Sequence, residues 1–292
     1  MALNFTGKTV VITGSAMGIG KGLTVCFAKE GANIVLVDLP GEKKRLEAWA
    51  QELKERYEIE TWTFYVDLTE ADGPERLYDK VKAGVGDIHT LVNNAGICWF
   101  GNFDDMPTDR LETMILLNCL AYAKLSRLFL PAMIEKDSGA ILNLSSISAF
   151  QPVPKMALYA ASKAFTQSLS EAVRSELPLR SNVVVSTLNP PFTKTSLIDD
   201  AGVPLDFVPL LTSFMNVNEV TSTGFKAFKK GRVRYVPGVF NKVMYLFVGK
   251  YVPTTVLTTL SRVLCNRMSD IMPEPVMNLF NKIRNQGGQN YV

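Results

Sequence analysis

Three side chains in the middle of the chain have the types and the spacing that proton transfer requires. Tyr159 and Lys163 are four positions apart, so on a helix they share a face about one turn from each other. Ser146 lies thirteen residues before Tyr159 and follows the apolar run 140–144. An ammonium favours the ionised phenol and lowers the tyrosine pKa towards the operating pH, where a general acid-base works best. These residues therefore predict proton exchange with an alcohol oxygen.

Two competing assignments are weaker. Tyr78 and Lys82 repeat the four-residue spacing, but Tyr65 stands thirteen positions before Tyr78 and the surrounding stretch is strongly charged. Ser145 competes with its neighbour as the catalytic hydroxyl, and the thirteen-residue spacing favours Ser146.

A glycine-rich turn near the start of the chain predicts a nucleotide site. Residues 8–13 read as a short buried strand, Gly14-Ser-Ala-Met-Gly-Ile-Gly20 as a turn, and residues 21–30 as a helix. Glycines permit a tight turn and close backbone approach to a pyrophosphate, and the helix start adds free N–H groups and a positive dipole end. The strand-turn-helix context makes this pattern a candidate dinucleotide site.

The next strand ends in a carboxylate that bears on the choice of dinucleotide. Residues 33–37 form a second apolar run, and Asp38 follows it, eighteen residues after Gly20. A carboxylate there accepts hydrogen bonds from a ribose and repels a 2′-phosphate. Met17 stands where a basic residue for that phosphate could lie. We therefore expect NAD rather than NADP, although the basic residues at 43–45 leave NADP open.

With these motifs the chain resembles the short-chain dehydrogenase/reductase family, in its common single-domain type. The matching motifs follow one another in the family's order: Thr13-Gly-Ser-Ala-Met-Gly-Ile-Gly20, Asp67-Leu68, Asn93-Asn94-Ala95-Gly96, Asn118, Ser146, Tyr159-Ala-Ala-Ser-Lys163 and Asn189-Pro190. The alternation of apolar strands with helices favours the same fold class, a Rossmann-like, doubly wound parallel sheet flanked by helices.

The resemblance implies a role for each catalytic residue. Tyr159 would be the acid-base, and Ser146 would orient and polarise the substrate oxygen. Lys163 would bind the nicotinamide ribose and lower the pKa of Tyr159, while Asn118 would hold a water that relays protons to Lys163.

The resemblance also implies the cofactor contacts. Asp67 would bind the adenine amino group, and residues 93–96 would line the adenine-ribose side and brace the sheet. The full set of implied cofactor-binding residues is Gly14, Ser15, Met17, Gly18, Ile19, Gly20, Asp38, Asp67, Leu68, Asn94, Ala95, Gly96, Tyr159, Lys163, Pro190, Thr193 and Thr195.

One departure from the family pattern affects that set. The family usually has Pro-Gly after the sixth strand, and this chain has Pro190-Pro191. Proline fixes φ near −65° and lacks an N–H. If the family glycine uses a positive φ, the loop carrying Thr193 and Thr195 must differ here.

Composition excludes several classes of function. A net charge of +3 over 292 residues is too small and scattered for nucleic-acid binding. His89 is the sole histidine, so we expect no metal site and no Ser-His hydrolase. The four cysteines form no C-x-x-C pair and residues 1–10 lack a signal-peptide pattern, which favours a cytoplasmic protein. No apolar run reaches the roughly 18 residues of a membrane span.

The C-terminal region departs from a minimal single-domain chain. We expect residues 1–238 to form the NAD-binding and catalytic domain, with residues 239–292 as a helical extension packed on it. Residues 243–252 and 256–264 are apolar with basic residues interspersed. They favour a helical lid or an oligomer contact, and the alternative is a basic amphipathic stretch lying on a membrane surface.

Apolar residues dominate the loops that should surround the substrate. They are Trp99, Phe100, Phe150, Pro152, Val153, Met156, Leu197, Ile198, Leu205, Phe207, Val208, Leu210, Leu211, Phe214 and Met215. We therefore expect an NAD-dependent oxidoreductase that interconverts a bulky hydrophobic secondary alcohol and its ketone, with a steroid-like or fatty-acyl-like substrate. The alternatives are a nucleotide-binding scaffold and a peripheral membrane-associated reductase.

Two predicted helices carry more apolar residues than one sheet-facing stripe needs. They cover residues 118–134 and 158–177, and paired helices of this kind form dimer contacts in the resembled family. We expect a homodimer or homotetramer. The residues that suggest it are Leu116, Leu120, Leu125, Leu128, Phe129, Phe165 and Leu169.

Overall fold

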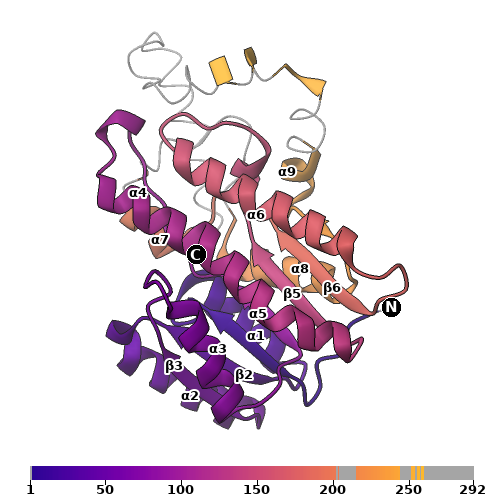
Figure 1. The fold of residues 1–292 in the computed structure, drawn as a ribbon. Helices are drawn as coiled ribbons and strands as arrows, with labels where there is room; N and C mark the ends of the chain where they lie inside the picture. The colour runs from indigo at the N-terminus through magenta and orange to yellow at the C-terminus, as the bar shows by residue number, and fades with distance from the viewer. Residues whose placement is uncertain are drawn as a thin grey trace, which may run out of the picture.

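Seven parallel strands form one sheet in the order β3-β2-β1-β4-β5-β6-β7. The computed structural model describes residues 2–201, 203, 215–243, 251–253, 255, 256, 258 and 259. The strands are β1 (Thr9–Thr13), β2 (Asn33–Asp38), β3 (Thr61–Tyr65), β4 (Thr90–Asn93), β5 (Gly139–Leu144), β6 (Val183–Leu188) and β7 (Arg234–Tyr235). The predicted fold class, a Rossmann-like sheet flanked by helices, is confirmed (Figure 1).

Each face of the sheet has its own apolar core, because successive side chains of a strand point to opposite faces. On β1, Val10 and Ile12 pack with α1 (Gly18–Ala28), α2 (Lys43–Tyr57) and α8 (Val217–Lys229). Val11 packs on the other face with α3, α5 and α6, and α5 and α6 lie in front of the sheet in Figure 1. The bounds of these three helices are Gly73–Gly84, Tyr122–Glu135 and Ala157–Glu176.

The strand order reverses between β1 and β4, which creates a crevice at the carboxyl edge of the sheet. Ligands of doubly wound sheets bind at such a switch point. The strands that meet there end in Thr13, Asp38, Asn93, Leu144 and Leu188. Most of the predicted cofactor-binding residues lie at or just after these ends, whereas Asn118 lies on η3 and Tyr159 and Lys163 lie on α6.

The helix after β4 is long and changes its winding midway. α4 (Thr108–Ile115) continues through a π-helical segment, η3 (Leu116–Ala121), into α5. By length and composition alone, 108–135 could cross a membrane. In the fold it covers the sheet, with α5 packed against β4, β5 and α3. Packing of this helix in the core of the domain therefore accounts for its apolar composition.

Short elements complete the described part of the chain. They are the 3₁₀ turns η1 (Pro40–Glu42), η2 (Phe103–Asp105) and η4 (Ile147–Phe150), and the helices α7 (Ser196–Asp200) and α9 (Val239–Val243). Most of the predicted extension 239–292 lies outside the described residues, so its helices and its packing stay predictions. Where the structure describes it, Val243 and Val256 are about half exposed.

Fewer of the residues predicted for an oligomer contact are exposed than the sequence suggested. Leu125 and Phe129 are buried in the sheet-facing core and cannot contribute to an interface. Leu120 and Phe165 are 43% and 42% exposed, and they lie on η3 and α6, which contact each other. Exposed apolar side chains on adjacent helices suit burial against a second copy of the chain.

We predict that the chain forms a homodimer or homotetramer through this surface. Sedimentation at micromolar concentration should show the oligomer, and Leu120→Glu combined with Phe165→Glu should shift it towards monomer by burying charge at the contact. A matched pair on exposed sites elsewhere, Leu39→Glu and Leu179→Glu, should leave the oligomer unchanged. A wild-type monomer peak would contradict the prediction.

Candidate active site

The glycine-rich turn is shaped by close backbone contacts. Gly14 and Gly18 have φ values of +64° and +55°, which disfavour any side chain. A Cβ on Gly14 would lie 2.9 Å from the Ala95 Cα, and one on Gly20 would lie 2.0 Å from the Gly14 carbonyl oxygen. The turn therefore folds tightly onto α1 and onto the end of β4, and leaves the first turn of α1 facing the crevice.

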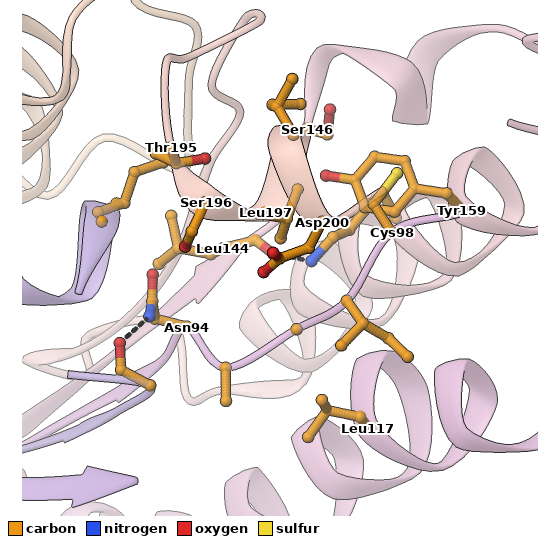
Figure 2. Close-up of a pocket in the computed structure, with 18 of the residues that line it drawn as sticks. Asn94, Cys98, Leu117, Leu144, Ser146, Tyr159, Thr195, Ser196, Leu197 and Asp200 are labelled. Carbon is orange, nitrogen blue, oxygen red and sulfur yellow. Dashed lines mark hydrogen bonds between the residues drawn. The ribbon is translucent and has the colours of Figure 1, made fainter. Parts of the chain in front are cut away.

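Asn94 joins this turn to the neighbouring strand. Its side-chain amide donates to the carbonyl oxygens of Thr13 (2.8 Å) and Gly14 (2.9 Å). The Thr13 hydroxyl accepts from the backbone N–H groups of Asn94 (3.0 Å) and Ala95 (3.1 Å). The ends of β1 and β4 are thus locked together, in agreement with the bracing role predicted for residues 93–96, and Figure 2 shows Asn94 at one end of the site.

Asp38 closes the outer side of the turn. Its two carboxylate oxygens accept from the N–H groups of Ala16 (2.8 Å) and Leu39 (2.9 Å). Burial raises the pKa of Asp38, and these two hydrogen bonds oppose the rise. Both bonds also fix the direction of the carboxylate. Asp67 is held in a similar way, because one of its oxygens accepts from the N–H (2.8 Å) and hydroxyl (2.7 Å) of Thr69.

Tyr159 and Lys163 stand on α6, where Tyr159 is partly buried and Lys163 is buried. The pKa of Tyr159 is raised, chiefly by burial and then by the nearby Cys98 thiol, while hydrogen bonding with Ser146 opposes the rise. Lys163 is 3% exposed, and its ammonium donates to the Leu144 carbonyl oxygen at 2.9 Å. Burial lowers the pKa of Lys163 to about 8. Figure 2 shows Ser146 beside the Tyr159 hydroxyl.

The net lowering of the Tyr159 pKa that the sequence predicts is wrong, because burial raises this pKa and outweighs any opposing effect of the Lys163 charge. Desolvation disfavours every charged form in the site, so it raises the pKa of the phenol and lowers that of the ammonium. Sequence spacing placed the pair correctly but carried no information on how deeply the fold would bury it.

The two adjacent serines have different partners. Ser145 donates to the Lys163 backbone oxygen at 2.8 Å, which ties the end of β5 to α6. The Ser146 oxygen accepts from the Ser148 N–H at 3.1 Å and lies in hydrogen-bonding contact with Tyr159. These contacts favour Ser146 over Ser145 as the hydroxyl that meets a substrate oxygen.

Asn118 is fully buried in η3 and acts as a brace. Its side-chain oxygen accepts from the Ile97 N–H (3.0 Å), and its amide donates to the Ile97 oxygen (2.9 Å) and to Ser162 (3.1 Å). The backbone oxygen of Asn118 accepts from the Thr166 hydroxyl at 3.2 Å. The side chain therefore holds the loop after β4 against α6, and the water-relay role stays a prediction.

The loop after β6 accommodates its second proline without strain. Pro191 is not among the residues with positive φ, so it needs no glycine-like backbone. The Pro190 oxygen accepts from the Ile147 N–H at 3.1 Å, and the Thr193 hydroxyl donates to the Pro191 oxygen at 2.8 Å. The Thr195 hydroxyl donates to the Thr193 oxygen at 3.3 Å. Both threonine hydroxyls are thus engaged within their own loop.

One cavity of about 790 Å³ joins these parts. The predicted residues that line it are Gly14, Met17, Gly18, Ile19, Asp38, Asp67, Leu68, Asn94, Ala95, Gly96, Ser146, Tyr159, Lys163, Pro190, Thr193 and Thr195. Ser15, Gly20 and Asn118 do not line it. Ser15 instead accepts from the Val37 N–H at 3.0 Å and binds the turn to β2.

The far end of the cavity is apolar, in part as predicted. Val153, Met156, Leu197 and Ile198 line it together with Cys98 and Phe192. Cys98 is a buried thiol whose pKa burial raises to about 12. The prediction is wrong for Trp99, Phe100, Phe150, Pro152 and Met215, which do not line the cavity, and 204–214 lie outside the described residues.

One wall of the cavity was missed from sequence. Arg110, Thr113 and Leu117 line it from α4 and η3, and Ser196 and Asp200 line it from α7. The spacing of the first three residues, three and then four positions, marks one face of a helix and was the available signal.

Comparisons with known proteins agree with this geometry. The family model for short chain dehydrogenases matches residues 8–202, so the chain belongs to the short-chain dehydrogenase family. It is 37% identical over 197 residues to the very-long-chain 3-oxoacyl-CoA reductase of Bos taurus, which covers 65% of this chain and 61% of that protein. The chain thus spans about three fifths of the length of this relative.

Two further proteins are similar. The hydroxysteroid dehydrogenase-like protein 1 of Gallus gallus is 34% identical over 201 residues, covering 68% of this chain and 59% of that one. A short-chain dehydrogenase from Sphingobium yanoikuyae, solved in complex with NADPH, superposes with a TM-score of 0.74 and 28% identity. That superposition covers 83% of this chain and 92% of the other.

Substitution of Ser146 and of Ser145 by alanine should have different effects on turnover and on thermal stability. Ser146→Ala should lower turnover by roughly 10²–10³, the usual effect of removing one donor to a reacting oxygen. Ser145→Ala should lower the melting temperature by about 2–4 °C through loss of one buried hydrogen bond, and should retain far more of the turnover. Turnover of any accepted ketone and thermal melting provide both readouts. A larger turnover loss in Ser145→Ala would reverse the assignment.

Proposed function

We propose that the protein is an NAD(P)-dependent oxidoreductase that interconverts a secondary alcohol and a ketone. The observation that carries this proposal is the joining of two sites in one cavity. Ser146, Tyr159 and Lys163 form one wall, and the glycine-rich turn with Asp38 forms the other end. The first group moves a proton, and the second suits a dinucleotide.

The residues present fit a nicotinamide dinucleotide. The turn at Gly14 and Gly18 brings the start of α1 to the cavity, where free N–H groups and the helix dipole suit a pyrophosphate. Asp38 offers acceptors for the adenosine ribose. The Lys163 ammonium has three donors, and one of them is used by Leu144, so the others can reach ribose hydroxyls. When bound, the nicotinamide would supply or accept the hydride.

The proton steps follow from the positions of the three side chains. In ketone reduction, Tyr159 gives its proton to the carbonyl oxygen while Ser146 donates a hydrogen bond to the same oxygen. The Lys163 ammonium then stabilises the phenolate that remains. In alcohol oxidation the proton returns to Tyr159. Because burial raises the pKa of Tyr159, the phenol is protonated at neutral pH and is ready as an acid for reduction.

The proposed substrate is a bulky hydrophobic ketone or secondary alcohol. The cavity wall beyond Tyr159 is made of Cys98, Val153, Met156 and Ile198, which present no charge. Burial of apolar substrate surface against such a wall contributes about 25 cal/mol per Å². The names of the bovine and chicken relatives, an acyl-CoA reductase and a hydroxysteroid dehydrogenase-like protein, support fatty-acyl-like and steroid-like substrates.

We further propose a preference for NAD. The Asp38 carboxylate is fixed by two N–H groups beside the turn, where it would repel a 2′-phosphate. Two of the three basic residues that left NADP open have carboxylate neighbours. Arg45 pairs with Glu42 at 2.8 Å, and Lys43 approaches Glu47 at 3.9 Å. The similar chain from Sphingobium yanoikuyae was solved with NADPH, so the preference for NAD rests on Asp38 alone.

Replacing Tyr159 tests the acid-base assignment. Tyr159→Phe keeps the ring and removes the ionisable oxygen, so turnover should fall by roughly 10²–10⁴. Screening secondary alcohols with NAD, read as NADH absorbance, supplies the substrate for the assay. Tyr78→Phe is the matched control, because Tyr78 also has a lysine four residues later. Near-normal turnover in Tyr159→Phe would reject the assignment.

Replacing Asp38 tests the cofactor preference. Asp38→Ser removes the charge that repels a 2′-phosphate, so the ratio of kcat/KM for NAD over NADP should fall by about tenfold or more. Asp79→Ser removes a carboxylate of α3 that does not line the cavity, and should leave the ratio unchanged. A wild type that prefers NADP tenfold would overturn the proposal.

A further inference from the structure

Lys163 is a buried cation that has no ion-pair partner among the described residues. Its ammonium has one hydrogen bond, to the Leu144 carbonyl oxygen, and none of the ion pairs in the described part of the chain involves it. Burying an ammonium is costly unless a partner compensates for lost hydration. The compensation must therefore come from groups that carry no formal charge.

Two aromatic rings occupy the place of that partner. The Lys163 nitrogen lies 5.3 Å from the centroid of the Tyr122 ring and 5.7 Å from that of the Tyr159 ring. Both distances fall within the roughly 6 Å at which a cation is attracted to an aromatic face, and the attraction is stronger in desolvated sites. Tyr122 is the first residue of α5, directly after η3, and is 2% exposed.

The hydroxyl of Tyr122 does not explain why a tyrosine occupies position 122. Its oxygen is buried and has no hydrogen-bond partner in the described part of the chain. Burial raises the pKa of Tyr122 well above its ordinary value, so the hydroxyl stays neutral. A buried hydroxyl without a partner is destabilising. The site therefore uses the ring of Tyr122 rather than its oxygen.

We propose that the Tyr122 ring serves as the uncharged counterpart of the Lys163 ammonium and keeps it protonated and in place below Tyr159. Tyr122 is then a positioning residue that acts through Lys163. This inference rests on the proposed role of Lys163 as a ribose ligand.

Other groups that face Lys163 do not supply a negative charge at neutral pH. Tyr159 comes from the same helix, Cys119 from η3 and Cys98 from the loop after β4, and burial raises the pKa of each. Asp200 of α7 is a carboxylate that lines the same cavity as Lys163. It is therefore the competing electrostatic partner and needs its own variant.

The test measures how the affinity for NADH, or for NADPH if it binds more tightly, depends on pH. Fluorescence titrations need no substrate. The wild-type affinity should fall as Lys163 loses its proton near its pKa of about 8. Tyr122→Leu removes the π face, which lowers the pKa of the ammonium, so the midpoint should move to lower pH by about one unit. Tyr122→Phe retains the ring and should keep the wild-type midpoint.

Controls separate this inference from the proposed function. Tyr57→Leu also removes a tyrosine whose hydroxyl is buried and unpartnered among the described residues, and it should not move the midpoint. Lys163→Met should abolish the alkaline fall. If Lys163→Met leaves affinity and its pH dependence unchanged, the proposed ribose role of Lys163 fails. If Lys163→Met abolishes the fall while Tyr122→Leu leaves the midpoint in place, the inference about Tyr122 alone fails.

Two more variants keep the inference falsifiable. If Tyr122→Leu does not fold, fluorinated phenylalanines at position 122 preserve ring volume and weaken the negative face, so they should lower the midpoint in step with fluorination. If the midpoint does not change with the degree of fluorination, the inference is overturned. Asp200→Asn should leave the midpoint near that of the wild type, and a downward move comparable to that expected for Tyr122→Leu would assign the partner role to Asp200 instead.

Discussion

The proposed chemistry depends on a buried cation, Lys163, that forms no ion pair with any residue the structure describes. Lys163 binds one carbonyl oxygen, at the end of β5, and the ring of Tyr122 lies below its ammonium. A carboxylate at that point would neutralise the charge that is needed to stabilise the phenolate of Tyr159. Polarisable rings and backbone dipoles allow the positive charge to remain available, at the cost of a lowered pKa. The geometry of α6 relative to β5 is therefore under tight constraint.

Uncharged amides and hydroxyls maintain that geometry. Asn93 at the end of β4 donates to Asn143 on β5 at 2.8 Å, and Asn143 donates to Ser170 on α6 at 2.8 Å. Asn118 adds a second connection to α6 through Ser162. Such networks position side chains in a low-dielectric interior, where each satisfied bond is strong and each lost one is costly. The carboxyl edge of the sheet is thus rigid where the chemistry is proposed, and a dinucleotide would meet a prepared surface.

Much of the fold and of the site was readable from sequence, because the motifs sit where strand periodicity ends. Asp38 follows an apolar run, and Tyr159 and Lys163 share a helical face, so local pattern sufficed. The burial and the electrostatic environment of these residues could not be predicted from the sequence. The raised pKa of Tyr159 and the buried position of Phe129 both depend on how helices pack across the sheet. The contact of Tyr122 with Lys163 joins residues far apart in the chain, and no rule of sequence spacing predicts it.

The central claim is that Tyr159 is the proton-transfer group and that positive charge in the site controls its ionisation. The most direct test is an NMR titration of protein labelled with ¹³C at the tyrosine ring carbon that bears the hydroxyl, with Tyr159→Phe used to assign the signal. The account predicts that Tyr159 titrates above the ordinary tyrosine range in the free protein. It also predicts a lower titration pH in the complex with NAD⁺, whose nicotinamide adds a positive charge next to that of Lys163. The same titration pH in both states would contradict the account.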